Sequence, residues 1–169
     1  FASTGGAILG NVDPPVHEAM APRPLSPYGA SKLAGEAYCS AFSGAYGLKT
    51  IALRFSNVYG PYSYHKGSVI AHFLNQIISS QELIVYGNGE QTRDFVFVED
   101  ICDGIARSLQ LPHTGVYQLG TGIPLTINRL IQLIGETVQS LYDMKVRYVA
   151  PRSGEIQHTW CDISQAAQD

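Results

Sequence analysis

The segment from 50 to 55 constrains the fold of this chain most strongly. Its residues, Thr-Ile-Ala-Leu-Arg-Phe, form a nearly continuous apolar run instead of alternating with polar residues. That pattern is typical of a strand buried on both faces of a parallel sheet. Parallel strands are joined by crossover connections, usually helices, so helical segments are expected between the strands.

The rest of the chain supplies this alternation. A proline-rich loop at 12–27 precedes the first expected helix. Apolar periodicity, caps and turn residues place helices at 28–45, 69–79, 99–109 and 126–141, with another starting at 163. Further strands are expected to end at 4 and to cover 83–86, 93–98, 116–119, 145–149 and 159–161. The sequence therefore predicts an α/β architecture with parallel pairing.

Charge and composition exclude several classes of function. The net charge is −3 over 169 residues, so no surface suited to a nucleic acid is expected. No apolar run approaches the roughly 18 residues that span a membrane. The histidines show no metal-ligand spacing, so we expect no metal site. The three cysteines lie far apart, which is typical of free thiols in a reducing compartment and predicts a cytoplasmic protein.

Tyr28 and Lys32 form a candidate chemical pair. They are four residues apart on an expected helix and therefore share one face. A lysine ammonium beside a phenol stabilises the phenolate, which a tyrosine needs to act as a general base near neutral pH. The bare spacing also arises by chance. Thr4 strengthens the interpretation because it ends an expected strand, at the sheet edge where open α/β folds bind ligands.

The residues around this pair are more specific than its spacing. Residues 26–36 read Ser-Pro-Tyr-Gly-Ala-Ser-Lys-Leu-Ala-Gly-Glu, and residues 1–4 read Phe-Ala-Ser-Thr. This set resembles the NAD-dependent epimerase/dehydratase family of extended short-chain dehydrogenases/reductases, whose hallmark is S-P-Y-x-x-S-K after a strand ending in S-S/T. The resemblance implies that Thr4 is the catalytic hydroxyl, Tyr28 the base and Lys32 the partner that binds the cofactor ribose. Ser3 remains a second candidate hydroxyl and a further expected contact of NAD, with Tyr28 and Lys32.

Further segments resemble motifs of the same family. Residues 54–61 are similar to R-x-x-N-V-Y-G-P, residues 91–100 to T-R-D-F-V-x-V-x-D, and residues 151–155 to R-x-G-E/D. Residues 67–70 resemble the family's helix start at the substrate pyrophosphate, and residues 83–87 its segment against uracil or thymine. By this resemblance Phe55 and Ser56 contact NAD. The implied substrate-binding residues are Thr4, Asn57, Ser68, Val69, Ile84, Tyr86, Arg93 and Arg152.

Physical chemistry supports two of these assignments and leaves structural alternatives for others. A helix start presents free N–H groups to an anion, and two arginines can neutralise a pyrophosphate through charge-assisted hydrogen bonds. Asn57 is also suited to ending a strand. Tyr86 is equally suited to a sheet core, and Arg152 to a solvated turn.

The resemblance implies an enzyme that uses NAD to oxidise C4 of a UDP- or dTDP-hexose. Reduction from the other face would make it an epimerase, whereas loss of water or CO₂ would make it a 4,6-dehydratase or a decarboxylase. Dehydratases of the family carry acidic residues directly after the catalytic threonine. This chain has Gly5 and Gly6 there, which favours the epimerase. An alternative of another class is an inactive piece with residual nucleotide binding. The parent enzyme is expected to be a homodimer.

The same resemblance predicts the domain organisation. Residues 1–61 and 92–123 are expected to form the C-terminal part of a Rossmann-type doubly wound parallel sheet that binds NAD. Residues 62–91 and 124–169 are expected to form a smaller nucleotide-sugar-binding α/β lobe, truncated at its C-terminus. The chain begins without methionine and contains no G-x-x-G-x-x-G loop. We therefore expect a C-terminal fragment of a longer enzyme whose NAD pyrophosphate loop lies upstream.

Overall fold

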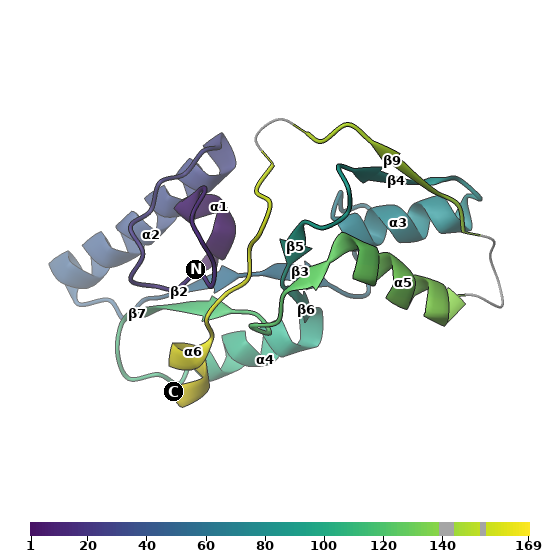
Figure 1. Cartoon of the computed structure of the whole chain (residues 1–169). Helices are drawn as coiled ribbons and strands as arrows, with labels where there is room; N and C mark the ends of the chain where they lie inside the picture. Colours follow the sequence, from purple (N-terminus) through teal and green to yellow (C-terminus); the bar gives the residue numbers. More distant parts are fainter. Residues whose placement is uncertain (139–143, 153–154) are drawn as a thin grey trace.

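The computed structural model describes residues 1–138, 144–152 and 155–169, which form two connected α/β parts (Figure 1). The larger part contains a sheet in the order β1 (Ala2–Thr4), β2 (Ile51–Phe55) and β7 (Gly115–Leu119). Both pairings are parallel, with Thr4 opposite Phe55 and Phe55 opposite Leu119. The carboxyl ends of all three strands therefore meet at one edge.

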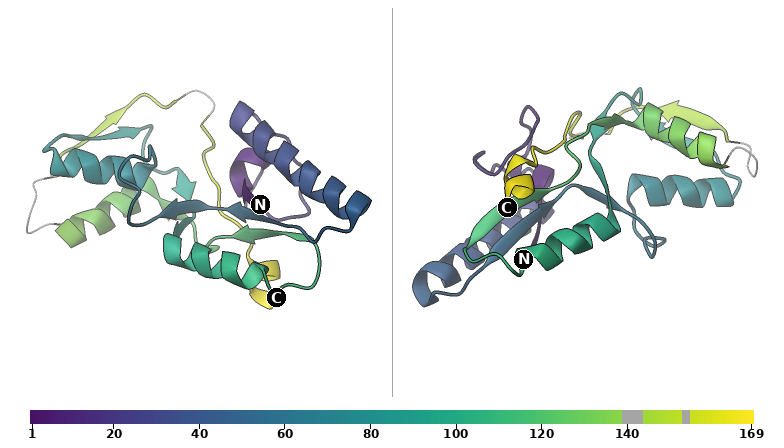
Figure 2. Two further views of the ribbon diagram at one scale, coloured as in Figure 1. Left: turned by 180° about the vertical axis from the view of Figure 1, so that it is seen from behind. Right: turned by 90° about the horizontal axis from the view of Figure 1, so that it is seen from below.

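Helices cover both faces of this sheet. Helix α2 (Pro27–Tyr46) packs against β1 and β2 on one face, and α4 (Val98–Ser108) lies on the opposite face (Figures 1 and 2). Two short helices complete the layers: α1 (Gly5–Leu9) packs against α2, and α6 (Ser164–Gln168) against β7. The nearly continuous apolar run of β2 is explained by this burial from both sides.

Helix α2 has strong boundary signals. Ser26 is its N-cap, and the serine hydroxyl accepts a 3.0 Å hydrogen bond from the Gly29 backbone N–H. Pro27 occupies the first helical position, where its missing N–H costs nothing. Gly47 ends the helix in the left-handed conformation, with φ of 66°. These local signals fix the position of Tyr28 in the first turn.

The smaller part has its own sheet and core. Strands β4 (Leu83–Tyr86) and β9 (Val146–Val149) pair in parallel, and helices α3 (Val69–Ile78) and α5 (Ile127–Val138) pack beside them (Figure 1). Their apolar side chains form one buried cluster, which consists of Phe73, Ile77, Leu83, Val85, Ile127, Leu130, Ile131 and Ile134.

Two short strand pairs connect the parts. Strand β3 (Asn57–Tyr59) pairs in parallel with β6 (Phe95–Phe97). Strand β5 (Thr92–Arg93) pairs with β8 (Leu125–Thr126), and this pairing is antiparallel. The single strand predicted at 93–98 is therefore wrong, because the chain changes partner at Asp94. The antiparallel pair is likewise an exception to the predicted parallel pairing.

Other predicted elements need correction. The sequence reading missed α1, β3 and β8, and the strand predicted at 159–161 is present only as isolated bridges. That segment crosses between the parts and bonds single residues of each, so it cannot form a regular ladder. Ser68 is the N-cap of α3, but its side chain makes no capping hydrogen bond. The end of the helix predicted at 126–141 lies outside the described residues. Within them, no helix is long and apolar enough to cross a membrane.

Candidate functional site

Residues from both parts of the molecule line a cavity of about 750 Å³. It lies at the carboxyl ends of β1 and β2 and continues past the start of α3 to β4. Lys66, Thr159 and Trp160 also contribute to its wall, and sequence reasoning did not assign them to the site. The residues predicted from the sequence that line it are Thr4, Tyr28, Phe55, Ser56, Asn57, Ser68, Val69, Ile84, Tyr86, Arg93 and Arg152.

Tyr28 and Thr4 are brought together by a close approach of helix α2 to the start of α1. Gly29 permits this approach, because a Cβ atom there would lie 2.1 Å from the Ala7 carbonyl oxygen. Lys32 follows on the same helix face, with its Nζ atom 5.8 Å from the centroid of the Tyr28 ring. The Lys32 ammonium also donates a 2.9 Å hydrogen bond to the Ala2 carbonyl oxygen. Lys32 is therefore positioned behind Tyr28 and does not itself line the cavity.

The two adjacent hydroxyls of β1 have different environments. Ser3 is buried, and its hydroxyl donates a hydrogen bond to Glu36 Oε1 at 2.5 Å. Thr4 is partly exposed and lines the cavity. The structure thus places the Thr4 hydroxyl at the site. The predicted contact of Ser3 with a cofactor is not supported for its side chain, because strand alternation turns it toward α2.

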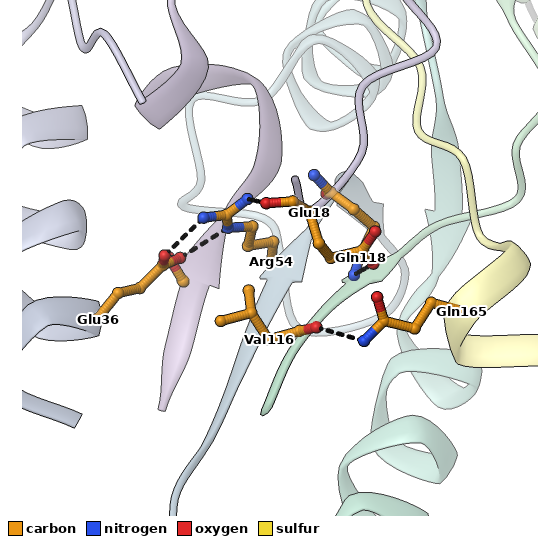
Figure 3. A network of polar contacts seen from close by, with 7 residues as sticks. Glu18, Glu36, Arg54, Val116, Gln118 and Gln165 are labelled. Atoms are coloured by element: carbon orange, nitrogen blue, oxygen red, sulfur yellow. Dashed lines mark hydrogen bonds and ion pairs between the residues drawn. The ribbon is translucent and has the colours of Figure 1, made fainter. Parts of the chain in front are cut away.

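Glu36 and Arg54 form a buried ion pair next to Ser3 (Figure 3). Arg54 Nε and Nη2 donate to the two carboxylate oxygens of Glu36 at 2.9 and 2.8 Å. Only 4% of the Arg54 side chain and 8% of the Glu36 side chain are exposed. The remaining Arg54 nitrogen donates to the Glu18 carbonyl oxygen at 3.4 Å. The pair therefore ties α2 to β2, and through Ser3 to β1.

The other end of the cavity has a helix start and an apolar strand face. Ser68 and Val69 begin α3, so the first N–H groups of this helix are available to an anion. On β4, Leu83 and Val85 pack in the apolar core, although Val85 also borders the cavity. Ile84 and Tyr86 are half-buried and line the cavity. The period of two along a strand explains why these two residues reach the site together.

The two predicted arginines both line this end but have different contacts. Arg93 donates to the carbonyl oxygens of Thr92 and Gln157 at 2.8 and 3.2 Å, and to Glu155 Oε1 at 3.2 Å. Burial lowers the pKa of Arg93, and the Glu155 carboxylate acts in the opposite direction. Arg152 is exposed, and its guanidinium carbon lies 3.8 Å from the centroid of the Tyr86 ring. Ser153 and Gly154 of the same predicted motif lie outside the described residues.

Asp94 is buried and accepts hydrogen bonds from two distant chain segments, a role that the sequence did not indicate. Its carboxylate accepts hydrogen bonds from the backbone N–H groups of Thr121 and Gly122, at 2.9 and 3.0 Å, and from the Cys161 thiol at 3.1 Å. Burial, together with the Asp94 charge, raises the pKa of Cys161 to about 12. The bonds to Cys161 hold the chain segment that brings Thr159 and Trp160 to the cavity. The Asp94 carboxylate also occupies the N–H groups of Thr121 and Gly122 in the glycine-containing turn at 120–122.

Comparisons with known proteins relate this chain to one family. The sequence model of the NAD dependent epimerase/dehydratase family matches residues 1–120. A putative UDP-glucose 4-epimerase of Methanocaldococcus jannaschii is 36% identical over 98% of this chain and 54% of its own length. Human dTDP-D-glucose 4,6-dehydratase is 30% identical over 81% of this chain and 40% of its own length.

A solved structure is similar over nearly the whole chain. The UDP-glucose 4-epimerase of Thermotoga maritima with UDP-glucose has a TM-score of 0.93 and 37% identity, covering 99% of this chain and 55% of that one. The chain thus spans about half the length of the curated relatives it matches first.

Because Glu36 and Arg54 form a buried ion pair, we expect that neutralising Glu36 strongly lowers the free energy of unfolding. The Glu36→Gln variant leaves the Arg54 charge uncompensated in the interior, so unfolding free energy should fall by about 3–5 kcal/mol. Glu82→Gln is the matched control, because Glu82 forms an exposed pair with Arg147 at 2.9 Å. Its cost should be below about 1 kcal/mol. Urea denaturation measures both changes, and equal losses would contradict a structural role of the buried pair.

Proposed function

This chain belongs to the NAD-dependent epimerase/dehydratase family, and from that premise we propose that the whole protein is a nucleotide-sugar epimerase. The proposed substrate is a UDP- or dTDP-hexose, oxidised at C4 and then reduced from the other face of the sugar. One observation carries the proposal: a single cavity has Thr4 and Tyr28 at one end and an anion-binding helix start with two arginines at the other. A sugar joined to a nucleoside diphosphate has its reactive and anionic groups separated in this way.

The residues at the strand ends fit NAD as the cofactor. Phe55 and Ser56 line the cavity beside Thr4, at the sheet edge where α/β folds bind nucleotides. The Lys32 ammonium uses one of its three donors on the Ala2 carbonyl and retains others for the hydroxyls of a ribose. We propose that these residues hold the nicotinamide half of the cofactor. When bound, NAD supplies the hydride exchange that no side chain can perform.

Proton transfer is assigned to the chain's own residues. Tyr28 takes the proton of the substrate's C4 hydroxyl and returns it when that oxygen is protonated again. The Lys32 ammonium lies 5.8 Å from the centroid of the Tyr28 ring, so a positive charge is next to the group that exchanges the proton. Thr4 keeps a hydrogen bond to the same oxygen and so holds it beside Tyr28. The buried network of Ser3, Glu36 and Arg54 keeps the elements that carry these groups in register.

The other end of the cavity would bind the nucleotide. The N–H groups at Ser68 and Val69 and the guanidinium groups of Arg93 and Arg152 suit a diphosphate. We propose that Ile84 and Tyr86 pack against the pyrimidine base and that Asn57 binds the sugar or its phosphate. In this arrangement residues 1–61 and 92–123 form the cofactor-binding part, from which Asn57 and Arg93 also reach the substrate, and residues 62–91 and 124–169 form the substrate-binding lobe.

The carboxylates that line the cavity are already engaged in other contacts, which favours the epimerase over a 4,6-dehydratase. Elimination of water needs an acid and a base near the sugar in addition to Tyr28. Gly5 and Gly6 follow Thr4 and supply neither. Among the described residues, the carboxylates that line the cavity are Asp94 and Glu155, and both are engaged: Asp94 by the 120–122 turn and Cys161, Glu155 by Arg93. A decarboxylase and a nucleotide-binding protein without turnover are the remaining alternatives.

The products formed by the full-length protein test the proposal. We expect that incubation with UDP-glucose and NAD⁺ yields the C4 epimer of the sugar nucleotide, detected by proton NMR. A 4-keto-6-deoxy product would instead identify a dehydratase. Binding of UDP-glucose without any product would support the nucleotide-binding alternative.

Tyr28→Phe tests the assignment of the base. Removing the hydroxyl removes the proton acceptor, so kcat should fall by roughly 10²–10⁴-fold while the nucleotide sugar still binds. Tyr38→Phe is the control, because Tyr38 lies on the same helix and is exposed like Tyr28 but is not among the cavity residues. A kcat within a few-fold of the wild-type value in Tyr28→Phe would exclude Tyr28 as the base.

A further inference from the structure

Arg152 and Tyr86 form a stacked contact inside the candidate cavity. The guanidinium carbon lies 3.8 Å from the ring centroid, within the range of a cation–π interaction. The chain path explains the contact, because Tyr86 is paired with Val149 in the parallel register and Arg152 follows three residues later. Both side chains line the cavity, so the stack itself forms part of the cavity wall.

A planar base would need the same ring face. Leu83 and Val85 pack in the apolar core, and Val85, although it borders the cavity, is only 1% exposed, so Ile84 and Tyr86 are the more accessible β4 side chains at the cavity. Stacking of a base on an aromatic ring requires van der Waals contact across the whole face. The guanidinium of Arg152 already makes that contact. The base and Arg152 therefore compete for Tyr86.

Arg152 is also the less restrained of the two arginines. Arg93 is fixed by Glu155 and by two carbonyl oxygens, and only 17% of its side chain is exposed. Arg152 is exposed, and within residues 1–138, 144–152 and 155–169 no carboxylate lies at ion-pair distance from it. Its guanidinium is thus available to pair with an incoming anion.

We propose, on the premise of the proposed function, that Arg152 is a specificity-determining residue that rejects nucleosides lacking phosphate. In the free protein it covers the Tyr86 ring, and it leaves the ring for the diphosphate when a nucleotide enters. A nucleoside must break the same stack but offers the guanidinium no anion in return. A nucleoside diphosphate replaces the lost contact by charge-assisted hydrogen bonds. Discrimination therefore comes from a contact that only phosphorylated ligands compensate.

Calorimetric titration with uridine and with UDP tests this selection. Arg152→Ala should bind uridine about 2- to 10-fold more tightly than the wild type, because the competing cation–π contact is gone. The same variant should bind UDP about 10- to 150-fold more weakly, because a charged hydrogen-bond donor to the diphosphate is lost. The two ligands thus change in opposite directions.

Two further variants separate this effect from a general change of charge or folding. Arg147→Ala removes the same charge from β9, where Arg147 is 60% exposed and pairs with Glu82 outside the cavity. It should leave both affinities unchanged. Arg152→Lys keeps the charge but has no planar face to lie on the ring. It should gain affinity for uridine and lose less affinity for UDP than Arg152→Ala.

The outcomes distinguish this inference from the proposed function. If the wild type binds UDP but neither Arg152 variant binds uridine more tightly, the competition for Tyr86 is refuted and nucleotide binding stands. If Arg147→Ala changed the affinities for uridine and UDP in the same way as Arg152→Ala, the inference would also be refuted, because the loss of a positive charge alone would then account for the result. If the wild-type chain binds neither UDP nor uridine, the proposed function fails and the inference fails with it.

Discussion

The buried pair of Glu36 and Arg54 is the interaction on which the arrangement of the candidate site depends. Each member of this network is close in sequence to a residue of the cavity: Ser3 precedes Thr4, and Arg54 precedes Phe55. Glu36 lies two helical turns after Tyr28, on the same face of α2. A buried ion pair contributes little net stability compared with apolar packing, but it penalises any geometry in which either charge loses its partner. The pair therefore fixes relative positions more than it adds stability.

Asp94 has the corresponding role where the two parts of the molecule meet. It lies between β5 and β6, and its carboxylate is hydrogen-bonded to the turn at 120–122 and to Cys161. These bonds hold the crossing segment that carries Thr159 and Trp160 against the cavity. With the Glu36 network at one end and Asp94 near the other, residues distant in sequence form one concave site. The two ends that we propose for catalysis and for anion binding thus each depend on a separate buried carboxylate.

Local patterns predicted much of this structure from the sequence. The α/β class, the helix that carries Tyr28 and Lys32, and most strand positions follow from periodicity, capping and the apolar run of β2. Features that depend on contacts between distant residues could not be predicted. Strand alternation implies that Ser3 and Thr4 face opposite sides of β1, but which of them faces the cavity has no local signature, and neither has the change of strand partner at Asp94. The stacking of Arg152 on Tyr86 depends on the register of β9 against β4, which no motif encodes.

The central claim is that one cavity joins a tyrosine-based proton transfer to the recognition of a nucleoside diphosphate. A crystal structure of the full-length protein with a bound UDP-hexose tests this claim most directly. The C4 hydroxyl is expected to lie within hydrogen-bond distance of Thr4 and Tyr28, and the diphosphate to contact the start of α3 and Arg152. A UDP-hexose bound with its sugar away from Tyr28, or with its diphosphate away from the start of α3, would contradict it.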